Sequence, residues 1–348
     1  MLGLESNAPD PAAPDVAALD AAARQALRAP SIFNTQPWQW RHRGGALELW
    51  ADWSRQLKVV DPHGHSLLVS CGAALHHARV SLAAAGWAAA VERTGERDRL
   101  ARIRLTGRGA PDPAAALLRD AIRVRRTDRR PFADQPVSPE LVQALVDAAA
   151  AEGVRLHRVR LGQMPMLAIA VAMAAADEMS NPAYRLELMR WINRPEWSGD
   201  GVPVETAVRK VPRRVPVRQF ALDPTAGVPV KPGGDRGAAY LILHGDGTAP
   251  GDWLRAGEAL SAVLLTAVSR GLAVAPLTDV LEVAHPRELV TGLLAPPGTP
   301  YALVRCGYQT DPTSLAPSPR RDPAEVIIPP GAATTPDPIR VGSEEPPE

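Results

Sequence analysis

The chain has 348 residues, 45% of them hydrophobic and 22% charged, which is ordinary for a globular protein with a large core. Its formal net charge of +1 provides no basic excess for phosphate contacts and disfavours nucleic-acid binding. The two cysteines, Cys71 and Cys306, form no disulfide or zinc-ligand pattern, the N-terminus resembles no signal peptide, and no apolar run reaches the ~20 residues that span a bilayer. We therefore expect a cytoplasmic protein that binds neither membrane nor nucleic acid.

Hydrophobic periodicity and turn residues predict helices and strands in alternation. Residues 1–15, rich in Ala, Pro and Asp, are expected to be a disordered tail, and Asp15 is the expected N-cap of the first helix. In chain order we expect helix 16–28, strands at 38–40 and 46–51, helix 66–90, strand 101–106, helices 112–126 and 139–151, strand 154–161, helix 165–178, strand 240–244, helix 253–270, and strands 273–275 and 301–306. A second disordered tail is expected over residues 331–348.

Two segments differ from the rest. Residues 66–90 carry almost no charge, so this helix is expected in the core, with Gly86 as its C-terminal cap. Residues 181–235 contain two tryptophans, many prolines and the basic run RKVPRRVPVR. Loops of this length inside a domain are usually lids or binding loops, so we expect a long, irregular, lid-like insertion.

The chain also contains a weak internal repeat. Gly72 and Gly86 bracket one apolar stretch, and Gly257 and Gly271 bracket another at the same spacing. The helix and strand predicted at 16–43 are echoed at 139–160. We therefore expect an α+β fold made of two related halves, residues 16–110 and 111–330, each with an antiparallel-type sheet flanked by helices and packed about a pseudo-twofold axis.

Three motifs carry the chemistry. They are PSIFNTQPW at residues 30–38, RRTDRRPF at 125–132, and GLAVAPLT at 271–278 with PRR following at 319–321. Together they resemble the nitroreductase superfamily, and the chain is most similar to the Acg family of actinobacterial FMN-binding oxidoreductases over roughly residues 16–330. It departs from the superfamily pattern at Thr127, which replaces a serine, and by one extra residue before Phe132.

The order of these motifs has a structural meaning in the family. Ordinary nitroreductases are homodimers in which the Pro-Ser-x-x-Asn segment reaches the flavin from the other subunit, and there the arginine motif comes first in the chain. Here Asn34 precedes Arg125. The resemblance therefore implies a nitroreductase-like, single-chain pseudo-dimer with one FMN site shared between the halves and a counterpart site that has lost its motifs.

The resemblance implies specific roles for some residues. Arg125 and Arg320 would bind the FMN phosphate, because guanidinium groups bind phosphate bidentately and stay charged. Arg129 would lie near the flavin N1–C2 edge, and the backbone N–H of Thr278 would face N5. No metal ligands and no protein-derived catalytic residues are implied. The complete set of expected cofactor-binding residues is Pro30, Ser31, Asn34, Gln36, Arg125, Arg126, Thr127, Arg129, Pro276, Leu277, Thr278 and Arg320.

Other conspicuous side chains have simpler interpretations. We expect Trp38 and Trp40 to be core aromatics, and His76 and His77 to be core or interface residues rather than metal ligands. Asp279 could polarise a substrate, although a helix cap is the simpler role.

The function implied by the resemblance is that of an FMN-dependent oxidoreductase. NAD(P)H would pass hydride to the flavin and leave, and a small organic acceptor would follow in ping-pong order. Two alternatives stay open, namely a flavin-sequestering protein without turnover and a flavin-dependent biosynthetic dehydrogenase. The pseudo-dimer could be a monomer or could pair again as a homodimer.

Overall fold

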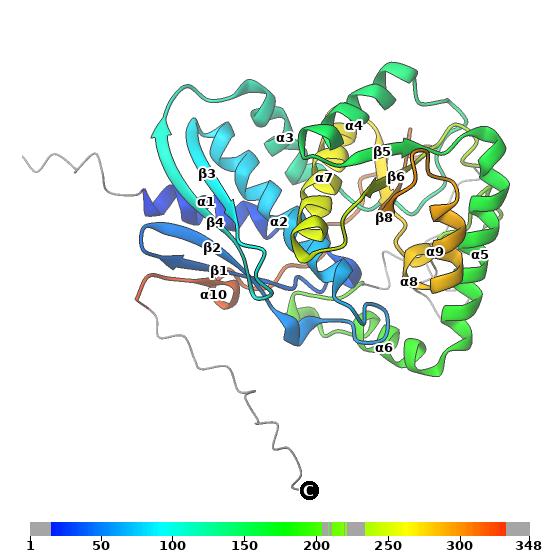
Figure 1. Cartoon of the computed structure of the whole chain (residues 1–348), viewed down its shortest axis with the longest axis horizontal. Coiled ribbons are helices and arrows are strands. Elements are labelled where there is room, and N and C mark those ends of the chain that lie inside the picture. The colour runs from blue at the N-terminus through cyan, green and yellow to red at the C-terminus, as the bar shows by residue number, and fades with distance from the viewer. Residues whose placement is uncertain (1–14, 204–207, 209–210, 219, 221–233, 332–348) are drawn as a thin grey trace, which may run out of the picture.

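The computed structural model describes residues 15–203, 208, 211–218, 220 and 234–331, which form two antiparallel-type sheets with helices between and around them (Figure 1). The expected disordered tails fall almost entirely outside these residues, as does part of the expected insertion.

The first sheet is built mainly from the N-terminal third of the chain. Its strands are β1 (Trp38–Arg43), β2 (Ala46–Ala51), β3 (Trp87–Arg93), β4 (Arg99–Arg108) and β9 (Ile327–Ile328). Gly44 and Gly45 have φ values of 54° and 67°, which suits the two-residue turn between β1 and β2. The strand order is β3-β4-β2-β1-β9, antiparallel except that β9 runs parallel to β1. The C-terminal end of the described chain thus returns to the first sheet.

The second sheet has the same plan. Its strands are β5 (Arg155–Arg158), β6 (Ala239–Gly245), β7 (Ala273–Pro276) and β8 (Thr299–Gly307). The order is β5-β6-β8-β7, and all three pairings are antiparallel. If the strands of each sheet are numbered in chain order and β9 is left aside, both sheets have the spatial order first, second, fourth, third. Two related halves would share such an order.

Ten α-helices of the described chain complete the structure. They are α1 (Val16–Ala26), α2 (His65–Ala84), α3 (Pro113–Val124), α4 (Pro139–Ala151), α5 (Met164–Ser180), α6 (Pro182–Ile192), α7 (Pro250–Ser269), α8 (Asp279–Glu282), α9 (Ala284–Thr291) and α10 (Pro323–Val326). The side chain of Asp15 accepts a hydrogen bond from the Ala18 N–H at 2.9 Å, so the expected N-cap is present.

The two core helices, α2 and α7, cross at the centre of the molecule between the sheets (Figure 1). A Cβ atom at Gly72 would lie 1.9 Å from the Leu254 carbonyl oxygen, and one at Gly257 would lie 2.0 Å from the Val69 carbonyl oxygen. Only glycine permits this approach, which explains why the predicted repeat has glycine at both places. Within the described residues, α2 is also the one helix long and apolar enough to cross a membrane, and 89% of that stretch is buried.

Three sequence expectations were wrong in part. The helix expected over 66–90 ends at Ala84, because Gly86 takes a φ of 80° and the alternating residues after it pair with β4 as β3. The insertion expected to be irregular contains α6, which Asn181 caps by accepting hydrogen bonds from two backbone N–H groups. The strand expected over 154–161 is limited to β5. Trp38 and Trp40 are fully buried, which confirms their assignment to the core.

Candidate functional site

The loop before β1 is held in a strained conformation. Phe33, Asn34 and Gln36 all have positive φ values, of 47°, 56° and 49°. Side chains other than glycine rarely adopt this region, and such residues concentrate at functional sites. The Asn34 side chain holds the loop by donating hydrogen bonds to the carbonyl oxygens of Gly201 and Pro319, both at 3.0 Å. The loop therefore depends on segments distant in sequence.

Gln36 belongs to the support of this loop. Its side chain is buried, donates to the Gly199 carbonyl at 2.8 Å and accepts from the Arg321 N–H at 3.0 Å. It lines neither of the cavities described below. Among the residues expected to bind the cofactor, Gln36 is the one whose side chain supports the loop and lines neither cavity.

Two adjoining cavities open beside this loop and share part of their lining. The first encloses about 860 Å³ and the second about 800 Å³, part of it open to solvent. Both volumes lie in the range of small-molecule sites. The residues that line both cavities are Pro30, Ser31, Phe33, Thr127 and Arg129. The first motif thus meets the arginine motif here, although about a hundred positions separate them in the chain.

The second cavity is the basic end. It brings Arg125, Arg126 and Arg320 together with Asn34. Arg125 is 5% exposed, and its Nε and Nη1 atoms have no hydrogen-bond partner. In the part of the chain that the structure describes, no carboxylate lies within ion-pair distance of any of these three arginines. The Arg320 guanidinium is oriented by Asn34 Oδ1 at 3.1 Å and by backbone carbonyls.

The electrostatics of this end favour an anion. Burial, reinforced by the neighbouring Arg126, lowers the pKa of Arg125 to about 10. Burial, and then the charges of Arg125, Arg126 and Arg28, lower the pKa of Arg320 to about 9. All remain charged near neutral pH, so the protein maintains a cluster of like charges at the cost of repulsion and desolvation. A bound dianion would relieve both, and unpaired buried donors of this kind mark a ligand site.

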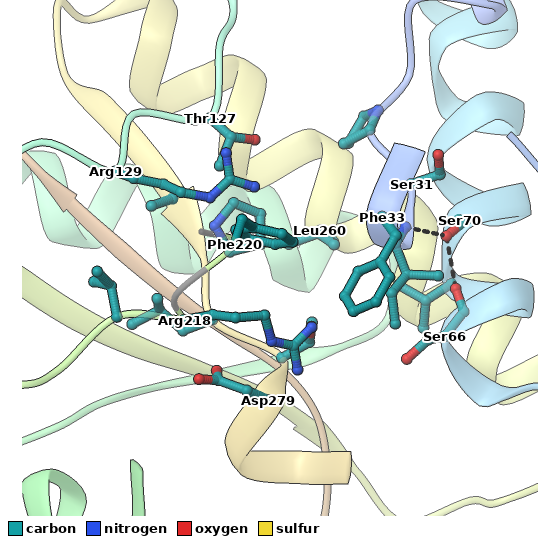
Figure 2. Close-up of a pocket in the computed structure, with 18 of the residues that line it drawn as sticks. Ser31, Phe33, Ser66, Ser70, Thr127, Arg129, Arg218, Phe220, Leu260 and Asp279 are labelled. Carbon is teal, nitrogen blue, oxygen red and sulfur yellow. Dashed lines mark hydrogen bonds between the residues drawn. The ribbon is translucent and has the colours of Figure 1, made fainter. Parts of the chain in front are cut away.

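The first cavity is wider and more apolar. Figure 2 shows Arg129, Phe220 and Arg218 on one side and Ser31, Phe33, Ser66 and Ser70 on the other, with Asp279 beneath Arg218. Pro276, Leu277 and Thr278 contribute the turn after β7, and Tyr301 of β8 also lines the cavity. Burial, and then the charges of Arg218 and Arg305, lower the pKa of Arg129 to about 10. A flat, largely apolar ring with polar edges fits such a cavity.

The 181–235 segment, expected to be a lid-like insertion, contributes Arg218 and Phe220 to this wall. Arg218 donates hydrogen bonds to Glu178 at 2.9 Å and to Glu282, which fixes its guanidinium in the cavity wall. The Phe220 ring packs edge-on against Phe33 at 5.6 Å between centroids. The Arg129 guanidinium lies 4.3 Å from the Phe220 centroid. The length of the segment, its tryptophans and its basic run indicated a lid or binding loop, but not which of its residues reach the cavity.

At the end of β3, in the first sheet, charged side chains are paired with one another. Arg93, the last residue of β3, follows Gly86 at the same distance at which Thr278, two residues past β7, follows Gly271. The Arg93 guanidinium donates two hydrogen bonds, of 2.6 and 2.8 Å, to Glu258, which is fully buried on α7. Arg79 donates to the same carboxylate at 2.7 Å. The turn after β7 therefore faces a cavity, whereas the end of β3 is committed to a buried ion pair.

His76 and the two cysteines lie in the core, away from the cavities. His76 is buried and its Nδ1 lies 2.9 Å from Ser261 Oγ across the helix crossing. Cys71 and Cys306 are buried and unpaired with each other. Within the described chain, no group of three or more His, Cys, Asp and Glu side chains is arranged to hold a metal ion.

Comparison with known proteins identifies the class. No family model matches the chain. A Mycobacterium tuberculosis protein named "Putative NAD(P)H nitroreductase Rv3131" is 39% identical over 317 residues, which cover 87% of this chain and 88% of the relative. Another, "Putative NAD(P)H nitroreductase acg", is 34% identical over 308 residues, covering 87% and 92%. The chain belongs to the nitroreductase family, in its Acg branch.

Solved structures are more distant. The FMN- and NADPH-dependent nitroreductase NfnB from Sphigopyxis sp. strain HMH is 19% identical with a TM-score of 0.39, covering 60% of this chain and 97% of its own. A nitroreductase with bound FMN from Desulfitobacterium hafniense DCB-2 is 16% identical with a TM-score of 0.36, covering 57% and 93%. At such TM-scores the family assignment rests on the sequence relatives.

Proposed function

We propose that this chain binds one FMN across the two cavities and acts as an NAD(P)H-dependent oxidoreductase. The observation that carries the proposal is the buried guanidinium of Arg125, which has unpartnered donors and two further arginines beside it at one end of a double cavity. A phosphate group matches this donor set in charge and geometry. Bound FMN would supply hydride and electron transfer, which no side chain can supply.

Chemically different parts of FMN would then lie in the two cavities. Arg125 and Arg320, with Arg126 nearby, would hold the phosphate in the basic cavity. Ser31, Thr127 and Asn34 line the passage in which the ribityl chain would lie. The ring would lie in the wider cavity, where a cation at Arg129 favours extra negative charge on the reduced ring.

The rest of the proposal follows from the family and the fold. The relatives are named NAD(P)H nitroreductases, which supports a nicotinamide reductant that binds first, leaves, and is replaced by a small organic acceptor. The matching strand orders support a pseudo-dimer of residues 16–110 and 111–330, with 181–235 as an insertion in the second half. Two buried free cysteines suit the reducing cytoplasm.

A second function is favoured by one observation. Phe220 and Arg218, from the insertion, line the cavity in which the ring would lie, and Phe220 packs against Phe33 on the opposite wall. A second substrate must share this space with the flavin. If the insertion does not move aside, the protein would store FMN without turning over.

Anaerobic reduction separates the two functions. The purified protein should show an FMN spectrum, and mixing it with NADH or NADPH should bleach the visible flavin band within seconds. An acceptor such as a quinone should then restore the colour. A yellow protein that neither nucleotide bleaches, but that photoreduction does bleach, would instead support storage.

A further inference from the structure

Among the residues that the structure describes, Asp279 is the one acidic residue in the lining of the first, wider cavity. It is the first residue of α8, and the residue at the N-cap position is Thr278, so Asp279 does not have the capping position expected from the sequence. Its side chain is 1% exposed, and neither carboxyl oxygen has a hydrogen-bond partner in the described chain. A buried carboxyl group without a partner, in the wall of a ligand cavity, is available to a ligand.

The groups around Asp279 leave it without a counter-ion. Arg218 faces it from the insertion, but this guanidinium donates its hydrogen bonds to Glu178 of α5 and Glu282 of α8. Glu178 and Glu282 are themselves buried, with side-chain exposures of 6% each. Three carboxyl groups therefore share one cation, with Tyr184 of α6 beside them and Arg129 elsewhere in the cavity wall.

Charge balance decides the protonation state of this cluster. Three ionised carboxylates around one guanidinium would leave two uncompensated negative charges on buried groups, which costs several kcal/mol per charge. Protonating the carboxyl that lacks a bond from Arg218 removes part of this cost. Burial raises the pKa of Asp279, reinforced by Glu178 and partly opposed by Arg218 and by the backbone N–H groups of Val280 and Asp279. Burial also raises the pKa of Glu282 to about 8, although Arg218 donates a hydrogen bond to that carboxylate.

We propose that Asp279 is a neutral carboxylic acid that donates a proton to the oxygen of an acceptor reduced in this cavity. The proposal rests on the proposed function and narrows its acceptor class to molecules, such as quinones, whose oxygen gains a proton on reduction. An acid placed at the reacting group contributes typically about 10²–10⁴-fold to such a step.

The step balances with reagents already named. Converting a quinone to a hydroquinone consumes one hydride equivalent and one proton. The hydride comes from the nicotinamide reductant by way of the bound cofactor. The proton comes from Asp279, whose O–H bond breaks as the acceptor O–H bond forms, and solvent reprotonates the carboxylate after the product leaves.

The test compares two acceptors in the FMN-loaded protein. p-Benzoquinone requires a proton, whereas ferricyanide takes electrons alone. For Asp279→Asn, which keeps the shape but cannot supply the proton, we expect the ratio of the quinone rate to the ferricyanide rate to fall by about 10²-fold or more. Asp177→Asn, an exposed acid on neighbouring α5, is the matched control and should leave the ratio unchanged.

A second measurement does not depend on turnover. The infrared spectrum of the wild type near neutral pH should contain the carbonyl band of a protonated carboxyl group, and Asp279→Asn should remove the contribution of Asp279 to this band and leave any contribution of Glu282. Asp279→Ser serves the same purpose if the asparagine variant does not load FMN. Absence of the band in the wild type would overturn the proposal.

The kinetic outcomes are equally distinct. Quinone and ferricyanide rates that fall together would show a role in binding and overturn the role as an acid, as would an unchanged ratio. If the wild type reduces both acceptors and Asp279→Asn has the same ratio of the quinone rate to the ferricyanide rate, only the proposed role of Asp279 is overturned. A wild type that reduces neither acceptor overturns the proposed oxidoreductase itself.

Discussion

The end of β3 and the turn after β7 each follow a glycine at the same spacing, yet they bury charge in opposite ways. Arg93, the last residue of β3, is paired with Glu258, and Arg79 shares the same carboxylate. After β7, Thr278 faces a cavity that continues toward Arg125, whose donors have no partner in the described chain. At the end of β3 the charged side chains are paired with one another, whereas in the cavities beside the turn after β7 they are unpaired and available to a ligand.

The difference lies in what each arrangement of buried charge allows. A buried ion pair contributes little net stability, but it excludes any ligand from the space that it occupies. An unpaired buried arginine costs stability until an anion binds. The first arrangement should therefore show its effect in folding and the second in binding, which variants can test separately.

The largest effect is expected from Glu258→Gln. The substitution leaves Arg79 and Arg93 without their shared carboxylate, and removing one partner of a buried pair typically costs about 3–5 kcal/mol. Because the two arginine side chains keep 30% and 24% of their surface exposed, we expect the lower end of this range. Urea unfolding of the FMN-free protein measures the loss.

Glu288→Gln provides the control for this prediction, since Glu288 is an exposed acid in a weak contact with His285. It should change the unfolding free energy by no more than about 0.5 kcal/mol. If Glu258→Gln weakened FMN binding while leaving stability intact, the ion pair would belong to the ligand site and the comparison between the halves would be wrong.

The comparison also shows what the sequence could reveal. The spacing of Gly72, Gly86, Gly257 and Gly271 predicted an internal repeat, and the structure places Gly72 and Gly257 where α2 and α7 cross, at an approach that glycine alone permits. The arginine motif and the strained loop were recognisable because their residue types are set by ligand chemistry and local backbone geometry. The structure brings these motifs to the same two cavities.

Other features depend on the tertiary path of the chain. Nothing local predicts that Phe220 reaches Phe33, since the 181–235 segment carries no strong periodic pattern. The pairing of Arg93 with Glu258 joins a strand end to the middle of a distant helix, and β3 was hidden because its alanines also suit a helix. Gln36 was misplaced because a family motif does not separate residues that touch the ligand from residues that hold the loop.

The next effect in size concerns the unpaired cluster. Arg125→Ala should weaken FMN binding by about 10- to 100-fold, because hydrogen bonds to charged groups contribute about 1.5–3 kcal/mol each. In contrast to Glu258→Gln, it should leave the FMN-free protein as stable as the wild type or more stable, since it removes a buried, unpartnered cation. Fluorescence titration with FMN and urea unfolding measure the two quantities.

Arg123→Ala is the matched control, because Arg123 is an exposed arginine on the same helix, α3. It should change the FMN affinity by no more than a factor of about two and the unfolding free energy by no more than about 0.5 kcal/mol. Full FMN occupancy of Arg125→Ala would exclude a phosphate role for Arg125, and a large loss of stability in the FMN-free variant would mean that this arginine has a structural partner.

The smallest effect is expected at the helix crossing itself, where the two halves meet. His76 on α2 contacts Ser261 on α7, and burial lowers the pKa of His76 to about 4, partly opposed by Glu152. The unfolded chain then binds one more proton than the folded protein between about pH 6.5 and 4. The unfolding free energy should thus be fully retained above this window and fall as the pH drops through it.

His76→Asn isolates this contribution, since asparagine can still hydrogen-bond Ser261 but does not titrate. Between pH 7.5 and pH 5 the unfolding free energy of the variant should fall by about 1–2 kcal/mol less than that of the wild type. The figure follows from the linkage of about 1.4 kcal/mol per proton and pH unit. Urea unfolding at several pH values gives the slopes. His285→Asn, at an exposed histidine, should leave the slope unchanged. Equal slopes for wild type and His76→Asn would mean that His76 is protonated in the folded protein and paired with Glu152. The ion-pair network of Arg79, Arg93 and Glu258 would then extend through Glu152 to the crossing of α2 and α7.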